Sequence, residues 1–488
     1  MLLSDYQWSH NPRGLHVAQA FESPPDYQRY IQPKMGWVKL LAAGIEYADD
    51  VRVFMDNNIT PIVRLYLGRY GAGPFDQHLQ RIIDTFVSAG VKWFEFYNEP
   101  NVDVEWPLGF DPSWENTSGI ISPMMDNWMN FAEYVASKGC YPGFVAMAES
   151  AVRNYAAVLW MDTFLNYIAD HHYERFRALL ANGMYCCYHP LIANHFYQEV
   201  PGGGPFSMRT PAAQVGTEGG WHFEYPYDPV SQSTDPGRTV YGGTAETPFG
   251  DPNGLVAMGR MFNERCASIF GSQAIPCIGT EGGIIPFLGG GQFQLDTRYP
   301  PYNERSQAEA TVAMFEWLAR EAPPWAFGVC MWKEDEFWIP HATQAIERLI
   351  QVPVVYKDVP AIPTMGSGPV VTTQTAVPFG PGPIHGEADF HMILLGPGLE
   401  TRWFFDTAQA YWNRFRPMVT THEELIQFIP TDRSLAVTVI ATPDTLDLMR
   451  SQIAERYVHV WYDEIPAESV EQIAETLNLR VRLDLRFG

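Results

Sequence analysis

The chain has 488 residues, 46% of them hydrophobic and 14% aromatic, which is enough to build a large buried core. Its 32 basic and 56 acidic residues give a formal charge of -24, which argues against a nucleic-acid backbone or an anionic membrane as the main partner. The first residues lack the basic and apolar regions of a signal peptide, and no apolar run approaches the length of a membrane span. We therefore expect a soluble protein, located in the cytoplasm unless a leader sequence was removed.

Strand-like and helix-like segments alternate along the first 350 residues. The predicted strands are 14–20, 36–41, 61–67, 92–97, 143–149, 184–189, 275–280 and 326–332. The predicted helices lie near 27–31, 45–57, 75–89, 123–138, 154–182, 252–271, 304–320 and 341–350. Eight consecutive strand–helix pairs favour a closed (β/α)8 TIM barrel, an α/β fold, over an open doubly wound sheet. In such a barrel the active site lies at the carboxyl ends of the strands.

The pattern changes after the predicted barrel, which we place at residues 1–350. Residues 351–388 are rich in proline and glycine and predict a linker. Residues 389–488 predict a small α/β domain with a mostly parallel sheet, whose strands are 391–395, 434–442 and 457–462. The role of this domain is open between a wall of the substrate cleft, an independent binding module and an oligomer interface. A homo-oligomer formed through it is the reading that we favour.

The fourth predicted strand runs directly into Asn98-Glu99-Pro100. Period-two alternation places Glu99 on the same face as Glu95 and the aromatic residues Trp93 and Tyr97. A carboxylate at the carboxyl end of a strand, beside an amide and before a rigid turn, suits proton transfer. The alternative is an asparagine that caps a turn beside an ordinary solvated glutamate.

A second predicted strand, the seventh, also ends in a glutamate, within Thr280-Glu281-Gly282. Strands four and seven face each other across a barrel, so Glu99 and Glu281 meet at its mouth. Two such carboxylates can cleave a glycosidic bond, because one protonates the leaving oxygen while the other attacks or stabilises the anomeric carbon. The motif recurs at Glu218, within the long segment 190–251 that precedes the sixth predicted helix, but the strand before it is weaker. We therefore favour Glu281 over Glu218.

Asn98-Glu99-Pro100 and Thr280-Glu281-Gly282 together resemble the catalytic motifs of clan A of the retaining glycoside hydrolases, across about residues 10–350. The resemblance implies that Glu99 is the general acid/base and Glu281 the nucleophile, with Asn98 hydrogen-bonded to the sugar 2-hydroxyl. It also implies a carbohydrate substrate and a retaining double displacement without a metal. Both motifs are short, and their weight comes from falling on strands four and seven of eight.

Further residues at the predicted strand ends fit a sugar site. Trp332 is a candidate stacking platform, His189 ends the sixth strand, and Arg64 lies near Glu281. Each has a structural alternative: Trp332 could fill the barrel top, His189 could be a core histidine, and Arg64 together with Lys39 could neutralise Glu95 inside the barrel. His16 and Glu149 also lie at predicted strand ends. Their roles stay open between contact with the substrate and support of the residues that contact it.

We expect neither a metal nor another cofactor. The histidines His171, His172, His189 and His195 lack the helical ligand spacing with a glutamate base that marks many metal hydrolases. No C-x-x-C pair occurs, so the cysteines are predicted to be buried free thiols. They are Cys140, Cys186, Cys187, Cys266, Cys277 and Cys330.

These observations predict a retaining β-glycoside hydrolase. Two alternatives remain open at this stage. One is a catalytically silent barrel that binds carbohydrate or protein, and the other is a transglycosylase that uses the same two carboxylates. The sugar, the linkage and the choice between internal and terminal cleavage depend on loops whose shape one sequence does not disclose.

Overall fold

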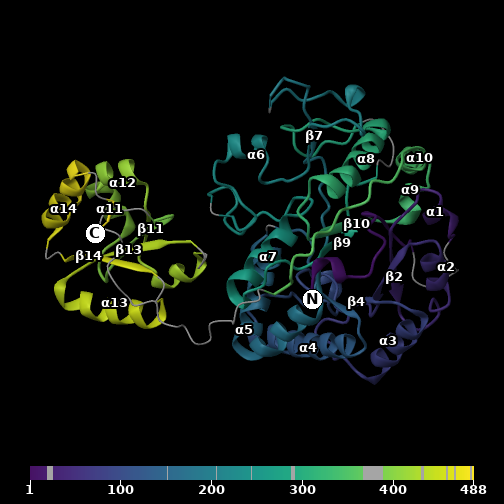
Figure 1. Ribbon diagram of the computed structural model, residues 1–488, viewed down its shortest axis with the longest axis horizontal. Helices are drawn as coiled ribbons and strands as arrows, with labels where there is room; N and C mark the ends of the chain where they lie inside the picture. Colours follow the sequence, from purple (N-terminus) through teal and green to yellow (C-terminus); the bar gives the residue numbers. More distant parts are fainter. Residues whose placement is uncertain are drawn as a thin grey trace. The chain divides into compact units, whose positions relative to one another are not determined.

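We analysed a computed structural model of the protein, which describes residues 1–18, 26–150, 152–204, 206–242, 244–286, 292–365, 388–429, 433–457, 460–466, 469–483 and 486–487. The chain divides into two compact units, Met1–Ser367 and Gly368–Gly488, and Figure 1 shows the elements of each.

The first unit is a closed barrel of eight parallel strands, as predicted. Around the barrel the order of the strands is β1-β10-β9-β6-β5-β4-β3-β2. Their bounds are β1 (Arg13–His16), β2 (Trp37–Ala42), β3 (Thr60–Leu65), β4 (Trp93–Glu95), β5 (Tyr141–Phe144), β6 (Tyr185–Tyr188), β9 (Cys277–Gly282) and β10 (Ala326–Met331). β9 is therefore the seventh strand of the barrel in chain order, and β4 is the fourth.

Helices surround the barrel on its outside (Figure 1). Their bounds are α1 (Gln28–Ile31), α2 (Asp50–Asp56), α3 (Gln77–Ala89), α4 (Ser122–Ser137), α5 (Ala157–Asn182), α7 (Ala257–Phe270), α8 (Glu304–Arg320), α9 (Glu334–Phe337) and α10 (Thr343–Gln351). Every residue of β2, β9 and β10 is buried, because helices cover the outer face of each strand and packed side chains fill the inner face.

Large aromatic side chains close the amino-terminal end of the barrel interior. Trp37 and Trp93 meet edge to face with their ring centroids 5.1 Å apart, and both are fully buried. The N-terminal segment contributes Tyr6, whose ring lies 5.7 Å from that of Trp93. The polar interior residues Lys39 and Glu95 follow Trp37 and Trp93 by two residues along β2 and β4, and therefore lie on the same face of each strand. The interior is thus apolar at its amino-terminal end and polar toward the mouth.

The largest differences from the predicted bounds are in four strands. β1 covers Arg13–His16 where 14–20 was predicted, and β14 covers Trp461–Pro466 where 457–462 was predicted. β4 ends at Glu95 instead of continuing through Tyr97, and the chain beyond it pairs with its neighbour through an isolated bridge between Asn98 and Ala146. β5 covers Tyr141–Phe144 and not 143–149, so Glu149 lies five residues past its end. Period-two alternation therefore does not extend to Glu99, which reaches the mouth on a loop.

The long segment 190–251, predicted to be irregular, contains small elements of its own. A two-stranded antiparallel pair joins β7 (Tyr197–Gln198) to β8 (Trp221–His222), and α6 (Pro229–Thr234) follows. Asp228 caps α6 by accepting a hydrogen bond from the backbone of Ser231. The remainder is formed by turns and a short helical turn.

The second unit is a doubly wound α/β domain with a four-stranded parallel sheet in the order β12-β11-β13-β14. The bounds are β11 (Phe390–Leu395), β12 (Met418–Thr420), β13 (Leu435–Ala441) and β14 (Trp461–Pro466), with helices α11 (Thr401–Thr407), α12 (Gln409–Phe415), α13 (Pro443–Arg456) and α14 (Val470–Leu483). Alternate residues of β11 face opposite layers: Leu394 belongs to one apolar cluster and Leu395 to another. β12 was not predicted, because three residues are too few to show a period.

Residues 351–365, whose composition predicts a linker, pack against the barrel. Lys357 is buried, and its Nζ donates hydrogen bonds to the carbonyl oxygens of Leu318 and Ala322 at 2.7 and 3.1 Å. Pro363 forms a bridge with Leu2 in the N-terminal segment. The rest of the predicted linker up to residue 387 lies outside the described residues.

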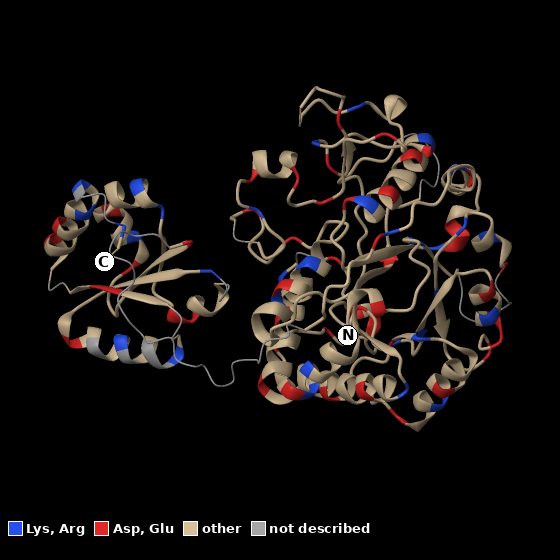
Figure 2. Ribbon diagram, viewed as in Figure 1, with Lys and Arg blue, Asp and Glu red and all other residues tan. Residues whose placement is uncertain are grey.

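The six cysteines are buried and free, as predicted. Acidic and basic residues both occur along the ribbons of both units (Figure 2). In the part of the chain that the structure describes, no helix is both long enough and apolar enough to span a membrane.

Candidate active site

The structure brings the two predicted glutamates together at the barrel mouth. Glu281 is the penultimate residue of β9, and its side chain is almost completely buried. Glu99 lies four residues past β4 with a φ of 36°, in the left-handed region that residues other than glycine rarely adopt. One oxygen of each carboxylate and one ring nitrogen of His189 lie within 4.8 Å of one another. A backbone conformation in a sparsely populated region, such as the positive φ of Glu99, is common at functional sites.

Four side chains from four different parts of the barrel approach the same oxygen of Glu281. Nη1 of Arg64 lies 2.6 Å from Oε1, and Nζ of Lys39 lies 3.0 Å from it. Nε2 of His16 and Nε2 of His189 are 3.5 and 3.9 Å from the same atom. Among the described residues, all four of these contacts fall on Oε1.

This cluster fixes the charge of Glu281. Burial by itself favours the neutral carboxyl, but Lys39, His189 and Arg64 outweigh it and hold the pKa of Glu281 well below its ordinary value. Lys39 is subject to the same balance with the opposite sign. Burial opposes its charge, while Glu281 and Glu95 hold the pKa of Lys39 above its ordinary value. At neutral pH Glu281 is therefore a carboxylate, as a nucleophile must be.

Lys39 connects Glu281 to a second buried carboxylate. Its Nζ lies 2.9 Å from Oε2 of Glu95 and 3.3 Å from Oγ1 of Thr280. The prediction that Lys39 could neutralise Glu95 is thus confirmed, although Arg64 is directed to Glu281 and Asn98 instead.

Glu99 has a different environment. Its side chain is 21% exposed, and its Oε1 lies 2.6 Å from Nδ1 of His189, which follows β6 and is itself buried. A protonated Glu99 can donate this hydrogen bond to Nδ1, and an ionised Glu99 can accept one from it. The contact therefore suits a group that gains and loses a proton during a reaction.

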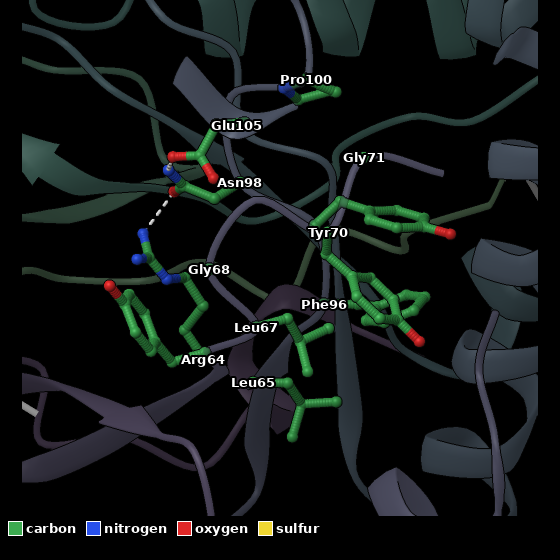
Figure 3. A pocket seen from close by; sticks show the side chains of 12 residues that line it. Arg64, Leu65, Leu67, Gly68, Tyr70, Gly71, Phe96, Asn98, Pro100 and Glu105 are labelled. Atoms are coloured by element: carbon green, nitrogen blue, oxygen red, sulfur yellow. Dashed lines mark hydrogen bonds between the residues drawn. The ribbon is translucent and has the colours of Figure 1, made fainter. Parts of the chain in front are cut away.

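Asn98 links the two halves of the site. Its Oδ1 accepts a short hydrogen bond from Nη1 of Arg64, and its Nδ2 donates to Oε1 of Glu105 at 2.8 Å (Figure 3). Burial raises the pKa of Glu105, against the hydrogen bond from Asn98. Glu105 was not predicted from the sequence, because it lies in a short 3-10 helix (Asp103–Glu105) after β4, where a single carboxylate carries no positional signal.

A pocket opens beside these residues between β3 and β4. Figure 3 shows Arg64, Asn98 and Glu105 at one side and aromatic and aliphatic side chains at the other. The apolar side includes Leu65, Leu67, Tyr70 and Phe96. Its cavity volume is about 20 Å³, which is room for about one water molecule, and neither Glu99 nor Glu281 lines it. The pocket is therefore a crevice beside the two glutamates and is too small for a whole sugar ring.

Trp332 follows β10 and is half-buried at the mouth. Its ring meets that of His16 at a centroid distance of 4.5 Å, edge to face. Burial lowers the pKa of His16, against the attraction of Glu281, so the imidazole is neutral at neutral pH. His16 thus contacts both Trp332 and Glu281.

Glu149 also lies near the mouth. Its Oε1 is buried and has no hydrogen-bond partner among the described residues. Burial, then the charges of Asp251 and Glu99, raise the pKa of Glu149 well above its ordinary value, which keeps this carboxyl neutral. Glu218, in contrast, lies on an exposed turn and pairs with Arg209 at 2.6 Å.

Glu99, His189 and Glu281 are close enough together to contact one ion. The surrounding charges do not fit a cation, however. Lys39 and Arg64 already lie within 3.0 Å of the Glu281 oxygen, and a divalent ion there would be repelled by both. The residues present therefore favour acid–base and nucleophilic chemistry over metal binding.

No protein-family model and no curated protein matches the chain. Among solved structures, the chain is similar to a GH128 (subgroup I) endo-beta-1,3-glucanase from Amycolatopsis mediterranei, at 11% identity, with 70% of this chain and 100% of that chain covered and a TM-score of 0.33. It is also similar to a GH128 (subgroup III) curdlan-specific exo-beta-1,3-glucanase from Blastomyces gilchristii, at 13% identity, with 70% of this chain and 100% of that chain covered and a TM-score of 0.35. A third similar structure is a sugar phosphate isomerase/epimerase from Parabacteroides distasonis, at 16% identity, with 59% of this chain and 98% of that chain covered and a TM-score of 0.22. All three TM-scores lie below 0.5.

Proposed function

We propose that the protein is a retaining β-glycoside hydrolase in which Glu281 is the nucleophile and Glu99 the acid/base. The observation that carries this proposal is the pair of carboxylates at the barrel mouth, with one oxygen of each within 4.8 Å. Retaining enzymes hold their two carboxyl groups about 5 Å apart, whereas inverting enzymes need more than about 6.5 Å to admit a water. The short separation supports double displacement.

The environments of the two glutamates support separate roles. Glu281 is surrounded by cationic and hydrogen-bonding groups that keep it ionised, so it can attack the anomeric carbon. Glu99 is partly exposed and bonded to His189, so it can give its proton to the departing oxygen. After the leaving group departs, ionised Glu99 takes a proton from a water, and this water attacks the anomeric carbon and releases Glu281.

The neighbouring side chains would orient the sugar. Asn98, held by Arg64 and Glu105, would hydrogen-bond the 2-hydroxyl of the sugar that reacts. Trp332 offers an aromatic face for stacking. Interactions with the 2-hydroxyl that strengthen in the transition state contribute to glycosidase catalysis.

The function can be tested with a panel of nitrophenyl glycosides and polysaccharides. We expect hydrolysis of at least one β-glycoside, loss of that activity in Glu281→Gln, and full activity in Glu218→Gln. The second variant is a matched control, since it makes the same change in the repeated Thr-Glu-Gly-Gly motif on an exposed turn. Activity retained by Glu281→Gln would refute the assignment of the nucleophile.

The same panel separates the proposal from its alternatives. A transglycosylase would transfer the sugar to an added acceptor faster than to water, which the ratio of transfer product to free sugar measures. A catalytically silent barrel would bind a glycan in a calorimetric titration without releasing product from any substrate.

We also propose that the second unit, residues 368–488, mediates homo-oligomerisation. Light scattering after size-exclusion chromatography tests this idea, by comparing the mass of the full chain with that of residues 1–367. An oligomeric full chain and a monomeric fragment are expected, whereas two monomers would contradict it.

A further inference from the structure

Lys39 is the most deeply buried charged group near Glu281. Its side chain is 0% exposed, and its ammonium lies 3.0 Å from Oε1 of Glu281 and 2.9 Å from Oε2 of Glu95. A group without any exposed surface cannot contact a substrate. The role of Lys39 in the site must therefore act through the two carboxylates that it touches.

We infer that Lys39, anchored by Glu95, is a positioning residue that holds Oε1 of Glu281 and so presents Oε2 as the attacking oxygen. This inference rests on the proposed function, because it assumes that Glu281 is the nucleophile. Its structural basis is independent of that assumption: all contacts from Lys39, Arg64 and the two histidines fall on Oε1.

Charge balance explains why a second carboxylate is needed. In the first step a lone pair of Oε2 forms a bond to the anomeric carbon, the bond to the leaving oxygen breaks, and this oxygen takes the proton of Glu99. Glu281 becomes a neutral ester and loses its negative charge. A lysine paired with Glu281 alone would then be an isolated buried charge, which is costly. Glu95 remains as its partner throughout the cycle.

Arg64 does not duplicate this role. It is slightly exposed and bonds Asn98 as well as Glu281, so it spans the part of the site that faces substrate. Lys39 lies below it, toward the barrel interior. The basic groups that face Glu281 come from β1, β2, β3 and the end of β6, namely His16, Lys39, Arg64 and His189. The acidic groups that face it, Glu99 and Glu105, come from the segment after β4.

The test compares Lys39→Met with the double variant Lys39→Met/Glu95→Gln. The single variant leaves Glu95 buried without its partner and can fail to fold, whereas the double variant removes both charges of the pair. Lys138→Met, which alters a surface lysine at the end of α4, is the control. Thermal unfolding establishes that each variant is folded before its activity is measured.

For the folded double variant we expect kcat/KM to fall by about 100-fold, since the misplacement of a reacting group by about 1 Å can have an effect of that size. We also expect the acidic limb of its pH profile to move upward by about one pH unit or more, because a nearby cation has been removed. A wild-type rate and pH profile in the double variant would overturn the inference.

A carbon-13 NMR titration of the Glu281 carboxyl distinguishes this inference from the proposed function. The midpoint should rise in the double variant and stay unchanged in Lys138→Met, whether or not a substrate has been found. If the wild type hydrolyses no glycoside but the midpoint rises in the double variant, the proposed function fails while the electrostatic interaction between Lys39 and Glu281 is confirmed. An unchanged midpoint in the double variant would contradict that interaction directly.

Discussion

Nδ1 of His189 lies 2.6 Å from Oε1 of Glu99, and Nε2 of the same ring points toward Glu281. A single imidazole therefore connects the proposed acid/base with the proposed nucleophile. It orients Glu99 through this contact and is itself buried.

Replacing His189 with alanine should lower kcat by about 100-fold, because Glu99 loses the group that orients it. His189→Asn should retain part of the rate, since its amide can occupy the place of Nδ1 and bond Glu99. Initial rates at substrate saturation measure both variants. Equal loss in the two would show that the hydrogen bond at Nδ1 is not the relevant feature.

Asn98→Ala should slow hydrolysis only of substrates that have a 2-hydroxyl. The loss corresponds to one hydrogen bond, about 1 kcal/mol or slightly more, which is roughly a tenfold fall in kcat/KM. A matched 2-deoxy glycoside should show no difference between the variant and the wild type. The ratio of the two effects is the measurement, and equal effects on both substrates would exclude a direct bond from Asn98 to the 2-hydroxyl.

The depressed pKa of Glu281 predicts how stability depends on pH. Because the folded value lies below the unfolded value of about 4.3, this residue contributes stability above that pH. The contribution is lost as the pH falls through the folded value. The free energy of unfolding, measured with urea, should therefore fall more between pH 7 and pH 3 for the wild type than for Glu281→Gln. A larger loss in the variant would mean that the sign is wrong.

The contacts of residues 351–365 predict where the barrel can be truncated. A fragment of residues 1–367 should be folded, whereas a fragment of residues 1–350 should have a lower melting temperature. The shorter fragment lacks the buried Lys357, the bridge from Pro363 to Leu2 and the bridge from Met365 to Ser272. Differential scanning calorimetry of the two fragments measures the difference, and identical melting temperatures would show that these contacts contribute nothing.

The barrel could be predicted from the sequence because its signals are local and repeated. Each strand is an apolar run followed by a helix-length segment, and eight repetitions define the fold even where the bounds of β4 and β5 are misplaced. The same count placed Glu99 and Glu281 at the mouth. A strand that ends in a glutamate can be recognised in the sequence alone. Its position among the eight strands then predicts where in the barrel that glutamate lies.

The contacts around Glu281 could not be predicted in the same way. Lys39 meets Glu281 across 242 positions of sequence, and Arg64 meets it across 217. Their convergence on one oxygen depends on side-chain rotamers and on the stagger of the strands, neither of which the pattern of apolar residues encodes. Glu105 is a similar case, since the loop after β4 decides that it reaches Asn98.

The configuration of the first sugar released from a β-glycoside tests the proposed mechanism most directly. Proton NMR in the first minutes of the reaction, before mutarotation, distinguishes the two anomers. Double displacement at Glu281 and Glu99 predicts the β-anomer. Release of the α-anomer would contradict it. Inversion needs a water between the substrate and the base, and this requires a wider separation than that of Glu99 and Glu281, of which one oxygen each lies within 4.8 Å of the other.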